Sequence, residues 1–190
     1  MMSPLEAFLR SQVKNPKAEE IAEILDVFDE RTYAKGEVFK EAYTLAKEVG
    51  FICSGSAQII IVKHNGEESL GRLLPTGHFL LDFISARSGE ETPIAIRFKE
   101  ASVVMVASHA RVKSLLETNL ALNIMVREYT ADRTVESGKW LMLYQIGSAK
   151  DRYQFILENN PKLLNRLPLR LIASMIGITP TQLSRIRKKK

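Results

Sequence analysis

The stretch IASMIGITPTQLSRI, residues 172–186, decides the C-terminal part of the fold. Ala173 is small enough for the point where two helices cross steeply, and Gly177 suits a turn that requires a positive φ. Thr179 can cap a second helix, with Pro180 at its first position and Gln182 completing a capping box. Apolar residues recur at the spacing of a shared helical core, at Ile172, Ile176, Ile178, Leu183 and Ile186. The stretch therefore predicts a helix-turn-helix.

The charge of the chain is concentrated around this motif. Residues 148–190 hold ten Lys and Arg against two Asp and Glu, a balance of +8. Residues 1–147 hold 17 basic and 20 acidic residues, a balance of −3, and the whole chain totals +5. A basic segment that coincides with a helix-turn-helix favours binding to the phosphate backbone of a nucleic acid.

The second helix of such a motif enters the major groove of DNA. Arg side chains read guanine there, and Gln side chains read adenine. We therefore predict a DNA-binding surface made of Thr179, Thr181, Gln182, Ser184, Arg185, Arg187, Lys188 and Lys189. The alternative is a helical hairpin without a nucleic-acid role, whose basic face is only solvated.

Upstream of the motif, the pattern of apolar residues and turn signals changes along the sequence. Residues 4–30 have apolar positions at helical spacing, whereas residues 33–106 alternate short β-rich runs with turn signals. The pair Asn65-Gly66 predicts a type I′ hairpin, because both central residues of that turn need a positive φ. Many short strands with regular turns indicate an antiparallel sandwich or barrel.

A long helix is predicted for residues 119–146, which contain no Pro and one Gly. Its apolar residues lie on two faces. One face contains Leu122, Val126, Tyr129, Trp140 and Leu143, and the other contains Ala121, Ile124, Ala131, Val135, Gly138 and Met142. Two apolar faces suggest a helix shared between its parent domain and a second surface.

The order of β domain, long helix and helix-turn-helix resembles the Crp/Fnr family of bacterial transcription regulators. The most specific matching segments are Arg152-Tyr153, residues 170–173 and residues 183–187. The resemblance implies an α+β fold with an antiparallel β-roll, similar to jelly-roll and cupin barrels, and flanking helices. It divides the chain into a sensor domain (1–117), a dimerisation helix (118–147) and a DNA-binding domain (148–190). The partners it implies are palindromic double-stranded DNA, a second copy of the chain and, for an activator, RNA polymerase.

Compared with the family pattern, this sequence has two departures. A wing hairpin usually follows the second helix, and this domain lacks a full wing, so residues 187–190 partly substitute for its phosphate contacts. In the sensor, Asp82 stands where a Glu would hold the ribose, and Thr92 or Pro93 stands where an Arg would pair with a cyclic phosphate. Without that cation we expect no binding of cyclic AMP or cyclic GMP. The degenerate effector pocket comprises Gly77, Phe79, Leu81, Asp82, Thr92 and Pro93, and its small-molecule effector is unknown.

Other classes of function have less support in the sequence. The single cysteine, Cys53, excludes a disulfide framework and fits a cytoplasmic protein. No secretion signal or membrane-spanning run is apparent. A haem is compatible with the family, but His64, His78 and His109 have no ligand spacing, so we predict no metal and no cofactor. No catalytic motif is found, and we expect no enzyme. Two alternatives stay open: a ligand-binding module that acts through protein contacts, and a cupin-like metal enzyme.

Overall fold

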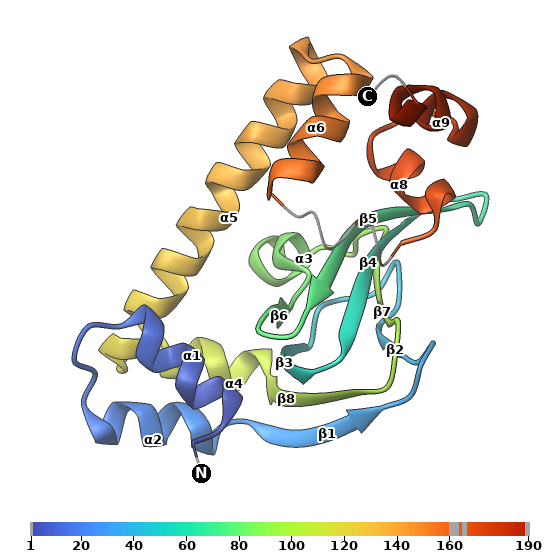
Figure 1. The fold of residues 1–190 in the computed structure, drawn as a ribbon. Coiled ribbons are helices and arrows are strands. Elements are labelled where there is room, and N and C mark those ends of the chain that lie inside the picture. Colours follow the sequence, from blue (N-terminus) through green and yellow to red (C-terminus); the bar gives the residue numbers. More distant parts are fainter. Residues whose placement is uncertain (1, 160–163, 165–166, 189–190) are drawn as a thin grey trace.

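The computed structural model describes residues 2–159, 164 and 167–188. It begins with helices α1 (Pro4–Gln12) and α2 (Ala18–Asp26), which pack against the first half of a long helix, α5 (Leu120–Ile146) (Figure 1). Ser3 caps α1 through a bond from the backbone N–H of Glu6 to its hydroxyl, with Pro4 at the first helical position as the sequence predicts. None of the helices among the described residues combines the length and the hydropathy of a membrane-spanning segment.

In the part of the chain that the structure describes, eight strands form two antiparallel four-stranded sheets that face one another as a roll. The first sheet runs in the order β1 (Asp29–Tyr33), β8 (Ser102–Ser108), β3 (Glu48–Ser54) and β6 (Phe79–Leu80). The second runs in the order β2 (Val38–Lys40), β7 (Ile94–Phe98), β4 (Ser56–Val62) and β5 (Glu68–Pro75). The α+β roll that the sequence predicts is thereby confirmed.

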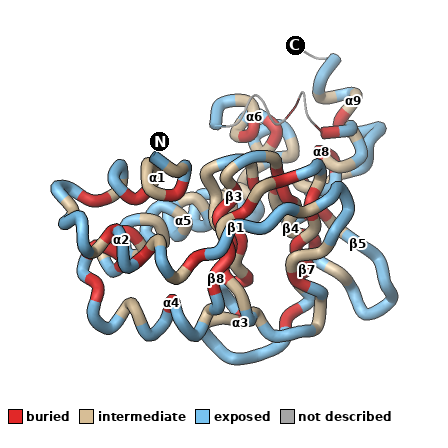
Figure 2. Tube along the Cα trace, turned by 90° about the horizontal axis from the view of Figure 1, so that it is seen from below, coloured by how far each residue is buried: buried red, intermediate tan, exposed pale blue. Residues whose placement is uncertain are grey.

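Apolar side chains fill the interior of the roll. Ile52, Ile96 and Phe98 are almost fully buried there, and the ring of Tyr33 stacks on Phe98 at 4.3 Å between centroids. Buried residues follow the strand centres, whereas turns and helix ends are exposed (Figure 2). The predicted hairpin at Asn65-Gly66 joins β4 to β5, and Gly66 has a φ of +82°. The hydrophobic effect thus holds the two sheets together.

Two short helices and the long helix complete the body. Helix α3 (Phe83–Ser88) follows β6, and α4 (His109–Leu115) follows β8. Helix α5 is capped by Asn119, whose Oδ1 accepts from the N–H of Leu122. Only the first turns of α5 are buried, and its later apolar side chains are largely exposed: Val135, Leu141, Met142, Tyr144 and Ile146.

The C-terminal part is helical, with α6 (Ala149–Asn159), α8 (Leu169–Met175) and α9 (Pro180–Lys188). Its core contains the fully buried residues Ile172, Ala173, Ile176 and Leu183, all of which come from the stretch that opened the sequence analysis. Helices α8 and α9 lie above the end of strands β4 and β5, beside the upper end of α5 and α6 (Figure 1). This C-terminal helical part is therefore packed against the roll as well as attached to the long helix.

Candidate nucleic-acid interface and sensor site

Helices α8 and α9 have the geometry of a helix-turn-helix. Gly177 occupies the turn with a φ of +69°, and the N–H of Ile178 donates to the carbonyl of Ala173 at 3.0 Å. The N–H of Gln182 donates to Thr179 Oγ1 at 3.2 Å, and the N–H of Thr179 donates to Gln182 Oε1 at 2.9 Å. These two reciprocal bonds are the predicted capping box, and they fix the start of α9.

The cap restricts what Gln182 can do. Bidentate recognition of adenine needs both the oxygen and the nitrogen of the amide. Gln182 Oε1 already accepts from both the N–H and the hydroxyl of Thr179. Thr179 and Gln182 therefore serve the start of the helix, and the predicted adenine contact requires the cap to open.

The remaining predicted DNA contacts lie mostly on one side of α9. Residues 181, 184, 185 and 188 share an arc because of the helical period. Thr181, Arg185 and Lys188 are exposed and Ser184 is half-buried, while Leu183 is buried against α8. Arg187 is also exposed and lies at the edge of this arc, and Lys189 lies outside the described residues. The arc presents two hydroxyls and two cations, as an element entering a DNA groove requires.

Arg152 attaches this unit to the long helix, a role that the sequence analysis did not identify. Its Nε donates to the carbonyl of Ile176 at 2.9 Å, and its Nη1 donates to the carbonyls of Gly147 at 2.9 Å and Leu143 at 3.3 Å. The guanidinium lies over the ring of Tyr144, whose hydroxyl donates to the carbonyl of Met175. One side chain thus satisfies backbone carbonyls where both α5 and α8 end. A cation is suited to these helix C-termini.

In the roll, Asp82 is a buried centre of hydrogen bonding. Its carboxylate accepts from the N–H of Ser85 at 3.1 Å, which caps α3, and from the hydroxyl of Thr92. It also pairs with Lys40 Nζ at 3.0 Å. Lys40 donates further to the carbonyls of Ile94 at 2.9 Å and Glu41 at 3.2 Å, so its ammonium makes contacts with three oxygens.

The structure therefore brings together two of the six predicted pocket residues, Asp82 and Thr92, and adds Lys40. Phe79 and Leu81 belong instead to the cluster that packs under α1 and α5, where the ring of Phe79 lies 5.2 Å from that of Tyr129. Gly77 adopts a φ of +84° in the turn before β6, and Pro93 is exposed. The position of Lys40 in a short strand gave no signal in the sequence, because its partner comes from a distant turn.

A second polar cluster joins the roll to α5. Arg72 on β5 pairs with Glu136 at 2.5 Å, and Arg133 pairs with the same carboxylate at 2.8 Å. His78 Nδ1 and Arg133 Nε are buried there without a hydrogen-bond partner among the described residues. Burial lowers the pKa of His78, and the charges of Arg72 and Arg133 lower it further, against a bond to the backbone of Thr76 and the charge of Glu136. This environment thus favours the neutral form of the imidazole.

Comparison with known proteins shows the fold. No family model matches the chain, and no curated protein matches it in sequence. Among solved structures, CLP of Xanthomonas campestris is 17% identical with a TM-score of 0.69, and each chain is covered to 91%. A CooA mutant from Carboxydothermus hydrogenoformans is 15% identical with a TM-score of 0.72, over 95% of this chain and 86% of that one. FixK2 of Bradyrhizobium japonicum is 18% identical with a TM-score of 0.68, over 86% and 84%.

Proposed function

Because this chain has the fold of the Crp/Fnr transcription regulators, we propose that it is a DNA-binding transcription regulator that recognises specific sequences. The observation that carries this proposal is the exposed arc of α9. Arg185 and Lys188 lie there on a helix whose start is fixed by the Thr179–Gln182 cap, within the segment of charge +8. Arg185 would read a base edge, and Lys188 and Arg187 would hold phosphates.

We propose that the regulator is a cytoplasmic homodimer formed along α5, with the sensor, dimerisation helix and DNA-binding domain divided at residues 117 and 147. The second apolar face of α5 supports this, because Val135 and Met142 are 58% and 56% exposed in the single chain. Burying such side chains against a second copy is favourable. Two α9 helices would then meet the half-sites of a palindrome about 34–36 Å apart. An activator would also contact RNA polymerase.

We further propose that the sensor does not bind cyclic AMP or cyclic GMP. A cyclic phosphate needs a cation in its site, and Lys40 already pairs with Asp82 and two backbone carbonyls. Breaking this buried pair would leave a charge without a partner. Neither nucleotide at micromolar concentration should raise the melting temperature, since only a ligand of the native state does so. Stabilisation by several degrees would contradict this, and a cyclic-nucleotide-binding regulator serves as the positive control.

The test of DNA binding is a salt titration with a fluorescent random-sequence duplex. Lys and Arg that neutralise phosphates release counterions, so the affinity should fall steeply as the salt concentration rises. A variant with Arg187→Ala and Lys188→Ala should show a shallower slope by about two phosphate contacts. Lys139→Ala, on α5, is the matched control and should leave the slope unchanged. Absence of salt-dependent binding would favour the alternative module that acts through protein contacts.

A further inference from the structure

One guanidinium joins the end of the long helix to the end of α8. Arg152 lies on the first turn of α6. It donates to the carbonyl of Ile176 at the end of α8, and to those of Leu143 and Gly147 at the end of α5. Apolar packing is not directional, whereas a hydrogen bond to a carbonyl depends on both distance and angle. These bonds therefore define how α8 is oriented relative to α5.

The link between α5 and α6 gives Arg152 a defined position. The N–H of Ser148 donates to Asp151 Oδ2 at 2.8 Å, and the N–H of Asp151 donates to Ser148 Oγ at 3.3 Å. This reciprocal cap fixes the turn of α6 that carries Arg152. A Cβ added at Gly147 would lie 2.7 Å from the carbonyl oxygen of Leu143, so the chain turns too tightly there for a side chain.

Tyr144 adds a second bond between the same helices. Its ring lies under the guanidinium of Arg152, 5.1 Å from the ring centroid, and its hydroxyl donates to the carbonyl of Met175. One side chain from α5 and one from α6 thus bind consecutive carbonyls of α8, just before the turn at Gly177 that leads into α9. Because Leu183 packs α9 onto α8, the two bonds also orient α9 relative to α5.

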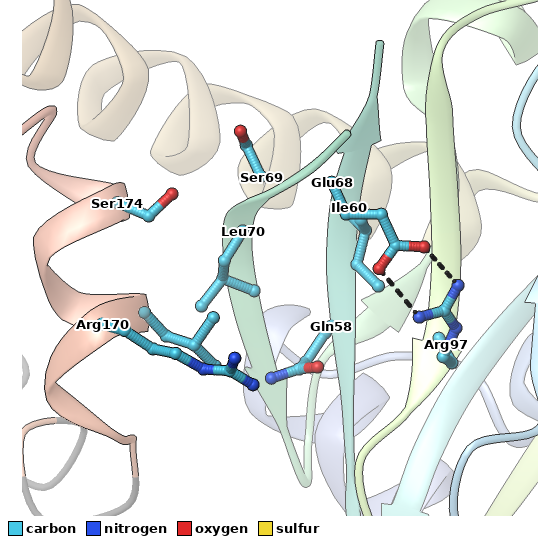
Figure 3. Close-up of a pocket in the computed structure, with 9 residues that line it drawn as sticks. Gln58, Ile60, Glu68, Ser69, Leu70, Arg97, Arg170 and Ser174 are labelled. Atoms are coloured by element: carbon cyan, nitrogen blue, oxygen red, sulfur yellow. Dashed lines mark hydrogen bonds and ion pairs between the residues drawn. The ribbon is translucent and has the colours of Figure 1, made fainter. Parts of the chain in front are cut away.

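Arg170, the cation on α8, has a different environment. It lines a crevice of about 440 Å³ beside the sheet, and Figure 3 shows its guanidinium extending towards the amide of Gln58. Its side chain makes no hydrogen bond or ion pair with any residue that the structure describes. Arg170 is therefore an arginine of the same helical unit that does not connect the unit to α5.

We propose that Arg152 is a positioning residue that selects the number of base pairs between the two half-sites. This inference rests on the proposed function as a DNA-binding dimer. Leu143 directly follows Met142, in the part of α5 proposed to contact the second copy, so Arg152 ties α8 to the dimer interface. One base pair moves a half-site by about 3.4 Å and turns it by about 34°. With each α9 held rigidly to α5, one spacing places both helices in the major groove.

The first test compares spacings. The probes are the palindromic duplex that wild type selects from a random pool, and the same duplex with one central base pair added or removed. Wild type should bind either altered duplex about 100-fold more weakly, because the DNA must twist to fit. Arg152→Lys keeps the charge but replaces the planar fork with a single nitrogen, so this loss should shrink to about ten-fold. Affinity for a duplex with one half-site should stay the same, since α9 is intact.

Two further variants make this comparison decisive. Arg170→Lys is the matched control and should keep the wild-type preference for one spacing. Tyr144→Phe removes only the hydroxyl bond to Met175, and it should relax the preference to a smaller extent even if Arg152→Lys fails to fold. If Arg152→Lys instead weakens binding to all three duplexes by the same factor, Arg152 only stabilises the unit and the inference is overturned.

The second test needs no DNA. Nitroxide labels at Lys139→Cys on α5 and Thr181→Cys on α9, in a Cys53→Ala chain diluted with unlabelled chain, report the distance within one protomer by double electron–electron resonance. Wild type should give one narrow distribution and Arg152→Lys a broader one. Equally narrow distributions in Arg152→Lys and Tyr144→Phe would also overturn the inference. If wild type binds no duplex, the proposed function fails and the spacing role fails with it, whatever the label distances are.

Discussion

Lys40 is a cation inside an apolar roll, and the free-energy cost of burying its charge depends on its partner Asp82. The side chains of Lys40 and Asp82 are 5% and 0% exposed, so neither is solvated. A buried pair contributes little net stability compared with apolar residues, but removing one member leaves an uncompensated charge. Asp82 is in addition the cap of α3 and the acceptor for Thr92. The pair therefore fixes the end of β2, α3 and the start of β7 relative to one another.

Replacing Lys40 with Met should for this reason lower the free energy of unfolding by about 3–5 kcal/mol. Urea denaturation measures this, and Lys35→Met at an exposed turn provides the control. Adding Asp82→Asn to Lys40→Met should recover part of the loss, since the buried negative charge is then removed. A single variant as stable as wild type would show that the pair is not buried as described.

His78 should make stability depend on pH. Burial, with Arg72 and Arg133 facing it from β5 and α5, lowers the pKa of His78 below 6.5, against the charge of Glu136. Below pH 6.5, His78 binds a proton in the unfolded chain more readily than in the folded chain. The free energy of unfolding therefore falls as the pH decreases. The contribution is fully present above pH 6.5 and is lost progressively towards the lowered pKa. His78→Gln should flatten this part of the stability profile; identical wild-type and variant profiles between pH 5 and pH 7 would contradict the assignment.

At the scale of elements, the parts that the sequence predicts are those fixed by neighbours in the chain. Capping and apolar spacing predict a helix-turn-helix around residues 172–186, and the structure has its two helices at Leu169–Met175 and Pro180–Lys188. The Asn65-Gly66 hairpin follows in the same way from the turn residues. Gln182 shows the limit of this reasoning, because its spacing fits both a cap and a base contact, and only the structure shows the cap to be made.

The long helix makes a prediction about assembly. Val135 and Met142 lie on a face of α5 away from Arg133 and Glu136, which contact the roll. A carboxylate in a buried apolar interface is costly, so Val135→Glu combined with Met142→Glu should convert a dimer into monomers. Sedimentation equilibrium measures the mass, and Ser114→Glu on α4 should remain dimeric. A variant with the dimer mass would place the interface elsewhere.

For the whole molecule, the contacts between distant segments were not predictable from the sequence. The Arg72–Glu136 pair joins residues 64 apart, and the Lys40–Asp82 pair links β2 to the cap of α3. Leu70 and Leu73 look like interior residues of a strand until the register shift turns both outwards onto α8. Such pairings depend on how the sheets fold over one another, and local propensity carries no information about them.

The uneven distribution of charge along the chain corresponds to two parts of the molecule. Residues 1–147 are mildly acidic, and residues 148–190 form a basic helical unit. This unit contacts the rest of the chain on two sides, through Arg152 to α5 and through α8 to β5. The basic unit therefore has packing contacts with both the roll and α5.

The proposed function requires that α9 reads DNA sequence as part of a dimer. The most direct measurement is selection of binding sites from a random duplex pool by wild type and by Arg185→Ala in parallel. Wild type should select a palindrome with half-sites about one helical turn apart. Arg185→Ala should lose about 1–3 kcal/mol of binding free energy and select the same palindrome with one position relaxed in each half-site. Selection of no common sequence by wild type, or of an unchanged motif by Arg185→Ala, would contradict the proposed function.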